Sequence, residues 1–189
     1  MNNAQPGLIR NKLDRIGKGD PIETNIPGLL SRERSLRAVL GSFATGVTVL
    51  TCRLSDGRRH GVTANSFTSV SLDPPLVLVC LSRTGRSGRA IVEAGVFAIN
   101  VLHTGQRAAA DDFSTVTKNR PVEEWSRTET GVPILRKSLA TIECAVRDVI
   151  EVGDHDVIIG SIRSTEMADS ALGPLVYYRG QYRTFSNVE

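Results

Sequence analysis

The sequence predicts a mainly β protein, an antiparallel barrel with a few peripheral helices. About six to eight short segments rich in β-branched and apolar residues are separated by glycine, proline and aspartate turn signals. Only about three segments have helical spacing, and they do not alternate regularly with the strands, which argues against a doubly wound parallel sheet. No repeat with a period of about 20–50 residues is present.

The 189 residues suit one domain with a tail, which we place at 31–189 and 1–30. The N-terminal arm is rich in asparagine, proline and glycine and has few periodic apolar positions. We expect it to be flexible or to pack on a dimer partner. A helix is expected from Ser31, because the apolar residues that follow have the i, i+3, i+4, i+7 spacing of one helix face. They are Leu36, Val39, Leu40 and Phe43.

The rest of the chain is predicted to consist of strands, turns and two further short helices. Strands are expected over 47–51, 61–71, 76–82, 97–102, 139–150 and 156–162, and as a hairpin over 175–185 that turns at Arg179-Gly180. Turns are expected at 55–57, 73–75 and 151–154, helices at 89–94 and 106–113, and a polar, irregular segment at 114–133.

Charge and hydropathy exclude several classes of function. The net charge is +3, and the 23 basic residues, 19 of them arginine, are interspersed with acidic ones, so we expect no nucleic-acid partner. The longest apolar run, Leu76 to Leu81, is far shorter than the ~20 residues that span a bilayer, so we expect no membrane segment. No secretory h-region is visible, which favours the cytoplasm. An anionic small ligand held by a few arginines remains open.

The three cysteines, Cys52, Cys80 and Cys144, each lie in an apolar, strand-like segment. Their odd number and the lack of C-x-x-C spacing favour neither a disulfide framework nor a zinc site, and inert thiols are the simpler interpretation. The three histidines lack ligand-like spacing. We therefore expect no metal.

One stretch combines amide and hydroxyl side chains with small residues: residues 61–75, G-V-T-A-N-S-F-T-S-V-S-L-D-P-P. Thr63, Asn65 and Ser66 are suited to hydrogen-bond the edge of a flat heteroaromatic ring. The alternative is an edge strand whose hydroxyls face water. Taken alone, these residues favour that alternative.

A second stretch, Ser82 to Arg89, follows an apolar strand and opens a helix. Helix N-termini attract anions, so its serines and arginines suit a phosphate. An exposed basic turn is an equally good interpretation. Further along, Gly153-Asp154-His155 lies at a turn, and Tyr177 to Arg183 combines aromatic rings with cations. These too have structural alternatives, a capped turn and an amphipathic last strand.

Several nucleotide and catalytic motifs are absent from the sequence: G-x-G-x-x-G, G-x-x-x-x-G-K-[ST], G-x-S-x-G and H-E-x-x-H. A bound nucleotide would therefore be held without a Rossmann or P-loop fingerprint.

Five blocks in order carry a resemblance to a known family. They are F-A-T-G-V-T-V at 43–49, residues 61–75, V-F-A-I-N-V-L at 96–102, G-D-H at 153–155 and Y-Y-R-G at 177–180. From about Leu36 to Phe185 the chain resembles the flavin reductase-like family, the reductase components of two-component flavin-dependent monooxygenases. The N-terminal arm lies outside the resemblance.

The resemblance implies a split β-barrel of the FMN-binding, Greek-key type that forms a homodimer. It implies an oxidoreductase that uses NADH or NADPH to reduce FMN or FAD and supplies the reduced flavin to a separate oxygenase. No residue needs to act as a nucleophile or an acid. The alternatives are a flavin-binding redox or sensor protein that keeps its flavin and, with little support, a purely structural interaction protein.

The resemblance also implies site residues. Those beside the isoalloxazine are Thr63, Ala64, Asn65, Ser66 and Ser69. Those at the flavin phosphate are Ser82, Arg83, Ser87 and Arg89, with Phe113 approaching the flavin. His155 positions the nicotinamide, with Tyr178 and Arg179 nearby. The residues after Phe113 depart from the family's F-A-G-x-x-x-x-R-F pattern, and the choice between FMN and FAD stays open.

Overall fold

The fold is taken from a computed structural model, which describes residues 29–115, 125–169 and 172–184. The chain divides into two units, residues 1–39 and 40–189. The first unit contains nearly all of helix α2 (Leu29–Leu40), which confirms the predicted helix but ends it before Phe43. Most of the N-terminal arm predicted over 1–30 lies outside the described residues.

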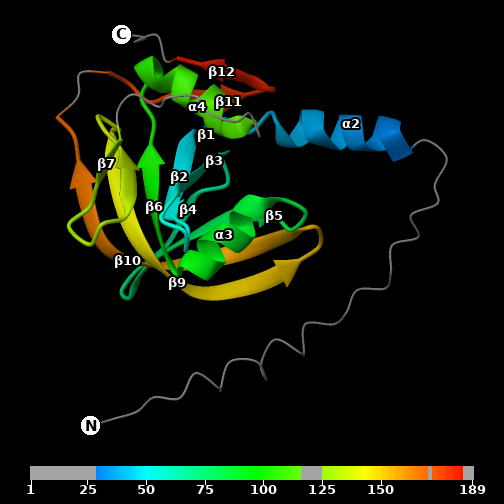
Figure 1. The fold of residues 1–189 in the computed structure, drawn as a ribbon. Coiled ribbons are helices and arrows are strands. Elements are labelled where there is room, and N and C mark those ends of the chain that lie inside the picture. The colour runs from blue at the N-terminus through cyan, green and yellow to red at the C-terminus, as the bar shows by residue number, and fades with distance from the viewer. Residues whose placement is uncertain (1–28, 116–124, 170–171, 185–189) are drawn as a thin grey trace. The chain divides into compact units, whose positions relative to one another are not determined.

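The second unit is built on one seven-stranded sheet in the order β3-β2-β6-β9-β10-β5-β4 (Figure 1). Its strands are β2 (Thr48–Arg53), β3 (Arg59–Ala64), β4 (Thr68–Leu72), β5 (Pro75–Ser82), β6 (Val96–Val101), β9 (Ala140–Val152) and β10 (His155–Met167). All neighbouring strands in this sheet pair antiparallel. The prediction of a mainly β, antiparallel protein is confirmed.

Smaller elements surround this sheet. A three-stranded sheet contains β1 (Thr45–Gly46), β11 (Val176–Tyr178) and β12 (Gln181–Arg183), and a further pair contains β7 (Trp125–Arg127) and β8 (Pro133–Leu135). The helices are α3 (Arg86–Ala94), the 3-10 turn η1 (Thr104–Gln106) and α4 (Arg107–Ser114). The prediction that 114–133 is irregular is wrong for β7. Residues 116–124 of that segment lie outside the described residues.

The single strand predicted over 61–71 is two strands, β3 and β4, separated by Asn65–Phe67. The interruption is caused by a contact with the neighbouring strand: the Ser66 hydroxyl accepts from the Cys80 backbone N–H and donates to the Cys80 carbonyl, at 3.0 and 2.8 Å. A side chain thus takes the place of the backbone ladder at this point. Helix α3 begins at Arg86, three residues before the predicted start.

Both predicted hairpins near the C-terminus are confirmed. Gly153 has a φ of +59° in the β9–β10 turn. Arg179 and Gly180, with φ values of +49° and +76°, form the β11–β12 turn. Two successive residues with positive φ give a twist that matches the flanking strands, which is why short hairpins favour this turn.

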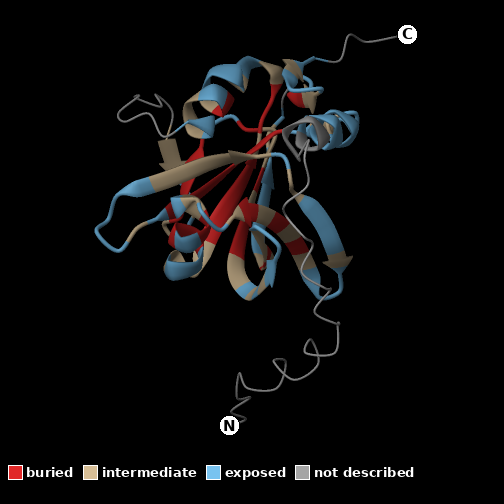
Figure 2. Ribbon diagram, turned by 90° about the vertical axis from the view of Figure 1, so that its right-hand side faces the viewer, coloured by how far each residue is buried: buried red, intermediate tan, exposed pale blue. Residues whose placement is uncertain are grey.

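The main core lies between the sheet and α3, where Leu50, Ile91, Phe97 and Ile158 are fully buried (Figure 2). A polar network fastens β8 to the sheet through Asn100, which is itself fully buried. Its amide donates to the Val49 carbonyl at 2.8 Å, and its oxygen accepts from the Leu135 N–H at 2.8 Å. The asparagine in the block at 96–102 is therefore structural.

Helix α4 packs on the face of β3 that is opposite the main core. The Thr63 hydroxyl donates to the Ala110 carbonyl at 2.6 Å. Two residues earlier, a Cβ on Gly61 would lie 2.6 Å from Cε1 of Phe113. Glycine at 61 therefore lets the Phe113 ring lie against the strand.

Within residues 29–115, 125–169 and 172–184, no helix is long and apolar enough to cross a membrane. The same residues contain no group of three or more His, Cys, Asp or Glu that would hold a metal ion.

We predict that Gly61→Ala destabilises the fold by about 1–3 kcal/mol, because the new methyl group forces the Phe113 ring to move. Gly46→Ala is the matched control, since a Cβ there meets nothing within 4 Å. Urea unfolding of the two variants measures the difference. Equal midpoints would show that Phe113 is not packed against Gly61.

We predict that the thiols react poorly in the folded protein. Burial raises the pKa of Cys52 to about 11, and burial together with the Glu143 charge raises the pKa of Cys144 to about 12. Burial also raises the pKa of Cys80, which is only half-buried. Because the thiolate is the reactive form, at mildly alkaline pH a disulfide reagent should titrate at most Cys80 in native protein and all three thiols in guanidinium. Rapid native reaction of two thiols would contradict this packing.

Candidate cofactor site

Two of the predicted site residues meet at the end of β5. In the β5–β10 register Ser82 is the Cα partner of His155. Side chains alternate along a strand, and here Val77, Val79 and Leu81 are buried in the core. Ser82 and Cys80 are half-exposed on the opposite side. Ser82 and His155 therefore share an accessible face, which we term the β5–β10 face.

A third predicted residue, Ser66, lies beside this face, along the edge of β5 that does not pair with β10. The Ser66 hydroxyl binds both backbone groups of Cys80, and Asn65 beside it is exposed. Asn65–Ser66 and His155 thus flank the end of β5. This gives a half-exposed, partly apolar surface with hydrogen-bonding groups at its two edges, as a flat heteroaromatic ring requires.

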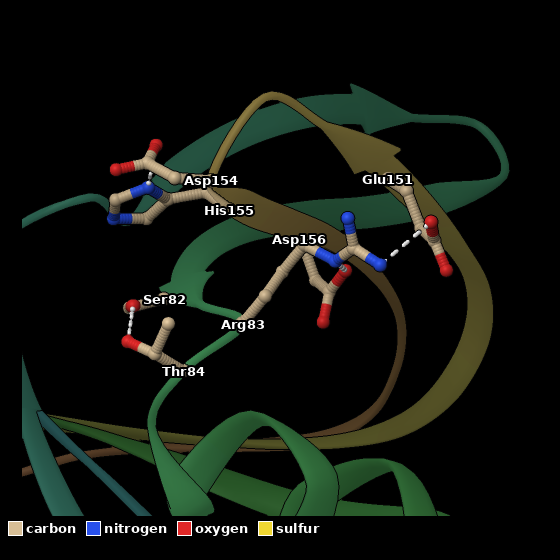
Figure 3. Close-up of polar contacts among 7 residues, drawn as sticks. All are labelled: Ser82, Arg83, Thr84, Glu151, Asp154, His155 and Asp156. Carbon is tan, nitrogen blue, oxygen red and sulfur yellow. Dashed lines mark hydrogen bonds and ion pairs between the residues drawn. The ribbon is translucent and has the colours of Figure 1, made fainter.

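His155 is held by its neighbour in the turn. Its Nδ1 lies 2.7 Å from Oδ1 of Asp154 (Figure 3). The hydrogen bond to His155 is the main cause that lowers the pKa of the Asp154 carboxyl, followed by the charge of the imidazole. A carboxylate at Nδ1 accepts a hydrogen bond from that ring nitrogen and fixes the tautomer and the ring orientation. Nε2 is then the ring nitrogen left to meet a ligand.

Arg83 does not join this face. Its guanidinium lies 2.8 Å from Glu151 and 3.5 Å from Asp156, on the side away from the Ser82 hydroxyl and the His155 ring (Figure 3). The strand alternation that places Ser82 on one side places its neighbour on the other. The Arg83 N–H also donates to the Asp154 carbonyl at 3.0 Å. Arg83 therefore joins the loop after β5 to the β9–β10 hairpin.

The other end of that loop is suited to an anion. Helix α3 begins after Gly85, which supplies no side-chain cap to the first N–H groups. Arg86 and Arg89 extend from the first turn, both exposed. Neither lies within ion-pair distance of a carboxylate in the described part of the chain. Free N–H groups at a helix start together with unpaired guanidinium groups fit a phosphate, so the residues present can hold a flavin phosphate.

Ser87 is oriented by a histidine that the sequence analysis did not select. Its hydroxyl lies 2.9 Å from Nε2 of His60 on β3. Burial, and then the charge of Arg86, lowers the pKa of His60, so the imidazole is neutral at pH 7. The pair ties the start of α3 to β3.

Beyond His60 lies a pocket of about 1480 Å³. Its lining contains seven arginines: three from the β2–β3 hairpin, two from α3, and Arg127 and Arg136. Glu93 and Asp112 are its two acidic residues. Phe113 and Trp125 form an aromatic wall, with their rings edge to face at 5.7 Å.

The remaining predicted residues lie elsewhere or have other contacts. Thr63 binds α4 and Ala64 packs against the core. Ser69 is exposed on β4, and the Arg179 guanidinium lies over the Tyr178 ring at 5.2 Å on the small sheet. The sequence analysis missed His60 and the pocket arginines outside the stretch 82–89, which are Arg53, Arg58, Arg59, Arg127 and Arg136. The run of Arg58, Arg59 and His60 directly after a turn was the available signal.

The chain is similar to known proteins along most of its length. The family model "Flavin reductase like domain" matches residues 40–186. A probable flavin reductase of Rhizobium meliloti is 46% identical over 152 residues, which are 80% of this chain and 48% of that protein. The chain thus spans about half the length of this relative.

Two solved structures are similar along most of their length. Nitrilotriacetate monooxygenase component B from Mycobacterium thermoresistibile has a TM-score of 0.80 and 36% identity, covering 84% of this chain and 89% of that one. The NADH:FAD oxidoreductase of Streptomyces globisporus, solved with NAD and FAD fragments, has a TM-score of 0.77 and 34% identity, covering 83% and 94%. The match of the family model over residues 40–186 shows that the chain belongs to the flavin reductase-like domain family.

Proposed function

We propose that this chain is an NAD(P)H-dependent flavin reductase that reduces FMN or FAD and passes the reduced flavin to a separate monooxygenase. The observation that carries the proposal is the β5–β10 face. It places Ser66, Ser82 and His155 around the end of one strand, beside an uncapped helix N-terminus suited to phosphate. The names of the three relatives support the reaction and the oxygenase partner.

When bound, the flavin and the nicotinamide supply the hydride-transfer chemistry themselves. The chain's own residues bind and orient. The start of α3 holds the flavin phosphate, and the edge at Asn65–Ser66 fixes the ring. His155, oriented by Asp154, positions the nicotinamide. Positioning of this kind removes an entropic barrier without any nucleophilic side chain.

The same proposal includes the finer fold and the assembly. We place the seven-stranded sheet in a Greek-key split barrel, and the domain at 31–189. We also propose a homodimer, because Val70 and Leu72 on the edge strand β4 are 48% and 94% exposed. Large apolar side chains on an edge strand favour a partner surface.

The direct test follows the oxidation of NADH and of NADPH by purified protein with FMN or FAD added in turn. Turnover of many flavin equivalents supports the proposal and identifies the preferred pair. Tightly bound flavin without turnover would overturn it in favour of a protein that keeps its flavin.

We predict that His155→Ala raises the KM for the nicotinamide cofactor about tenfold, which corresponds to the loss of one good hydrogen bond. The dissociation constant of FMN should stay within about twofold. Asp154→Asn should have a smaller effect, because the amide oxygen can still accept from Nδ1. Steady-state kinetics and flavin fluorescence titration measure the two quantities. Weakened flavin binding with an unchanged nicotinamide KM would contradict the role of His155.

We predict that Gly85→Asp weakens FMN binding at least about tenfold while leaving thermal stability equal or higher. The carboxylate caps α3 and occupies the position of the phosphate, whose charge it repels. Gly85→Asn is the matched control of equal size, and both meet the same contact with the Ser82 carbonyl. Equal FMN affinity of the two variants would show that the phosphate binds elsewhere.

A further inference from the structure

His155 lies at the end of a hairpin that extends beyond its neighbours in the sheet. Strand β6 pairs with β9 only as far as Ala145, and β5 pairs with β10 from Ser161 to His155. Within the described residues, the segment Asp148 to Val152 of β9 pairs with β10 alone. Such an end, with few neighbours, is the part of a sheet that opens most readily. A side chain that positions a ligand from there needs a further restraint.

The end of this hairpin contains two carboxylates that repel each other. Glu151 on β9 and Asp156 on β10 are direct Cα partners, so their side chains lie on the same face. Like charges directly opposite each other on neighbouring strands destabilise the pairing. The two residues flank the turn that carries Asp154 and His155. Their repulsion therefore acts against the strand pairing at the point where His155 is held.

Arg83 meets both carboxylates. Its guanidinium lies 2.8 Å from Glu151 and 3.5 Å from Asp156 (Figure 3). A cation between two opposed carboxylates replaces one repulsion with two attractions. The Arg83 backbone N–H also donates to the Asp154 carbonyl at 3.0 Å, so Arg83 contacts both strands and the turn. Because the guanidinium and the His155 ring lie on opposite sides, Arg83 acts on a ligand at His155 through the turn.

Asp156 also connects the hairpin to helix α3. A Cβ on Gly88 would lie 3.9 Å from Oδ2 of Asp156, so this carboxylate faces the first turn of the helix. A negative charge is stabilised at a helix N-terminus. The start of α3 and the turn at His155 are thus joined through one carboxylate and the guanidinium of Arg83.

We propose that Arg83 is a positioning residue for the nicotinamide cofactor, acting through His155. Its guanidinium neutralises the Glu151–Asp156 pair and so holds the turn in the orientation in which His155 meets the nicotinamide. The inference rests on the proposed function and deepens it. The family resemblance implies a place for Arg83 at the flavin phosphate, whereas under this proposal it serves the other cofactor.

The test variant is Arg83→Met, which removes the charge but keeps an unbranched side chain and the backbone N–H. Arg147→Met is the matched control: Arg147 lies on the same hairpin, is 41% exposed against 45% for Arg83, and pairs with Asp148 at 3.4 Å. Calorimetric titration measures the binding of NAD⁺ and of NADP⁺ to full-length protein saturated with FMN. Flavin fluorescence measures the binding of FMN, and thermal melting checks that each variant is folded.

We expect Arg83→Met to weaken binding of the preferred nicotinamide cofactor about fivefold, the upper end for exposed ion pairs, and to leave FMN affinity within about twofold. Arg147→Met should change neither. In a His155→Ala background, Arg83→Met should weaken binding by less than about twofold further, because residues that act through one another are not additive. Arg83→Lys should recover part of the affinity, since an ammonium group still neutralises the pair.

Glu151→Gln separates positioning from a general effect of charge. Both nicotinamide cofactors carry phosphates, so if net charge alone mattered, the loss of this carboxylate would tighten their binding about as much as Arg83→Met weakens it. Under the proposal, Glu151→Gln alone changes the affinity by less than about twofold and removes most of the effect of Arg83→Met, because the repulsion is gone.

The inference is overturned if the wild type binds neither NAD⁺ nor NADP⁺, if Arg83→Met leaves their binding unchanged, or if FMN affinity falls instead. It is also overturned if the effect persists in full beside His155→Ala. These binding results do not depend on turnover. A protein that reduces flavin and gives one of these results keeps the proposed function and loses the role of Arg83. A protein that binds the nicotinamide cofactor as expected and reduces no flavin does the reverse.

Discussion

The loop between β5 and α3 is held from both sides, and the candidate site depends on that constraint. On one side the Arg83 backbone N–H donates to the Asp154 carbonyl. The Arg83 guanidinium pairs with Asp156, whose side chain is only 17% exposed. On the other side Ser87 binds His60. Exposed ion pairs contribute little on their own, about 0–1 kcal/mol. The backbone bond and the strand register therefore set the position of the loop.

Most elements that depend on local sequence were predictable. The two turns follow from Gly153 and Gly180, because glycine tolerates positive φ, and the strand at 76–82 follows from a short apolar run. The interruption at Asn65–Phe67 was not predictable, because it depends on Ser66 meeting the backbone of Cys80, 14 residues away. The β7–β8 pair likewise depends on Asn100, which reaches Leu135 across 35 residues. Period and propensity carry no information about such contacts.

The candidate site was likewise predictable only in part. The types of residue at 82–89 indicated an anion-binding loop, and the uncapped start of α3 is consistent with that. The hydroxyl and guanidinium of neighbouring Ser82 and Arg83 nevertheless point to opposite sides, because a strand alternates. The meeting of Ser82 with His155 depends on the register of a hairpin 73 residues further on. The family resemblance suggested both residues, whereas no spacing rule would have joined them.

In the proposed reductase, the openness of the β5–β10 face has a chemical consequence. A flavin that must leave after reduction cannot be buried as deeply as a permanent cofactor, whose pocket covers most of its surface. Asn65 is exposed and His155 half-exposed, which suits a ring that enters and leaves. Affinity can then come from a part of the ligand that does not react, the phosphate at the start of α3. Binding energy from such remote groups orients the reacting ring without enclosing it.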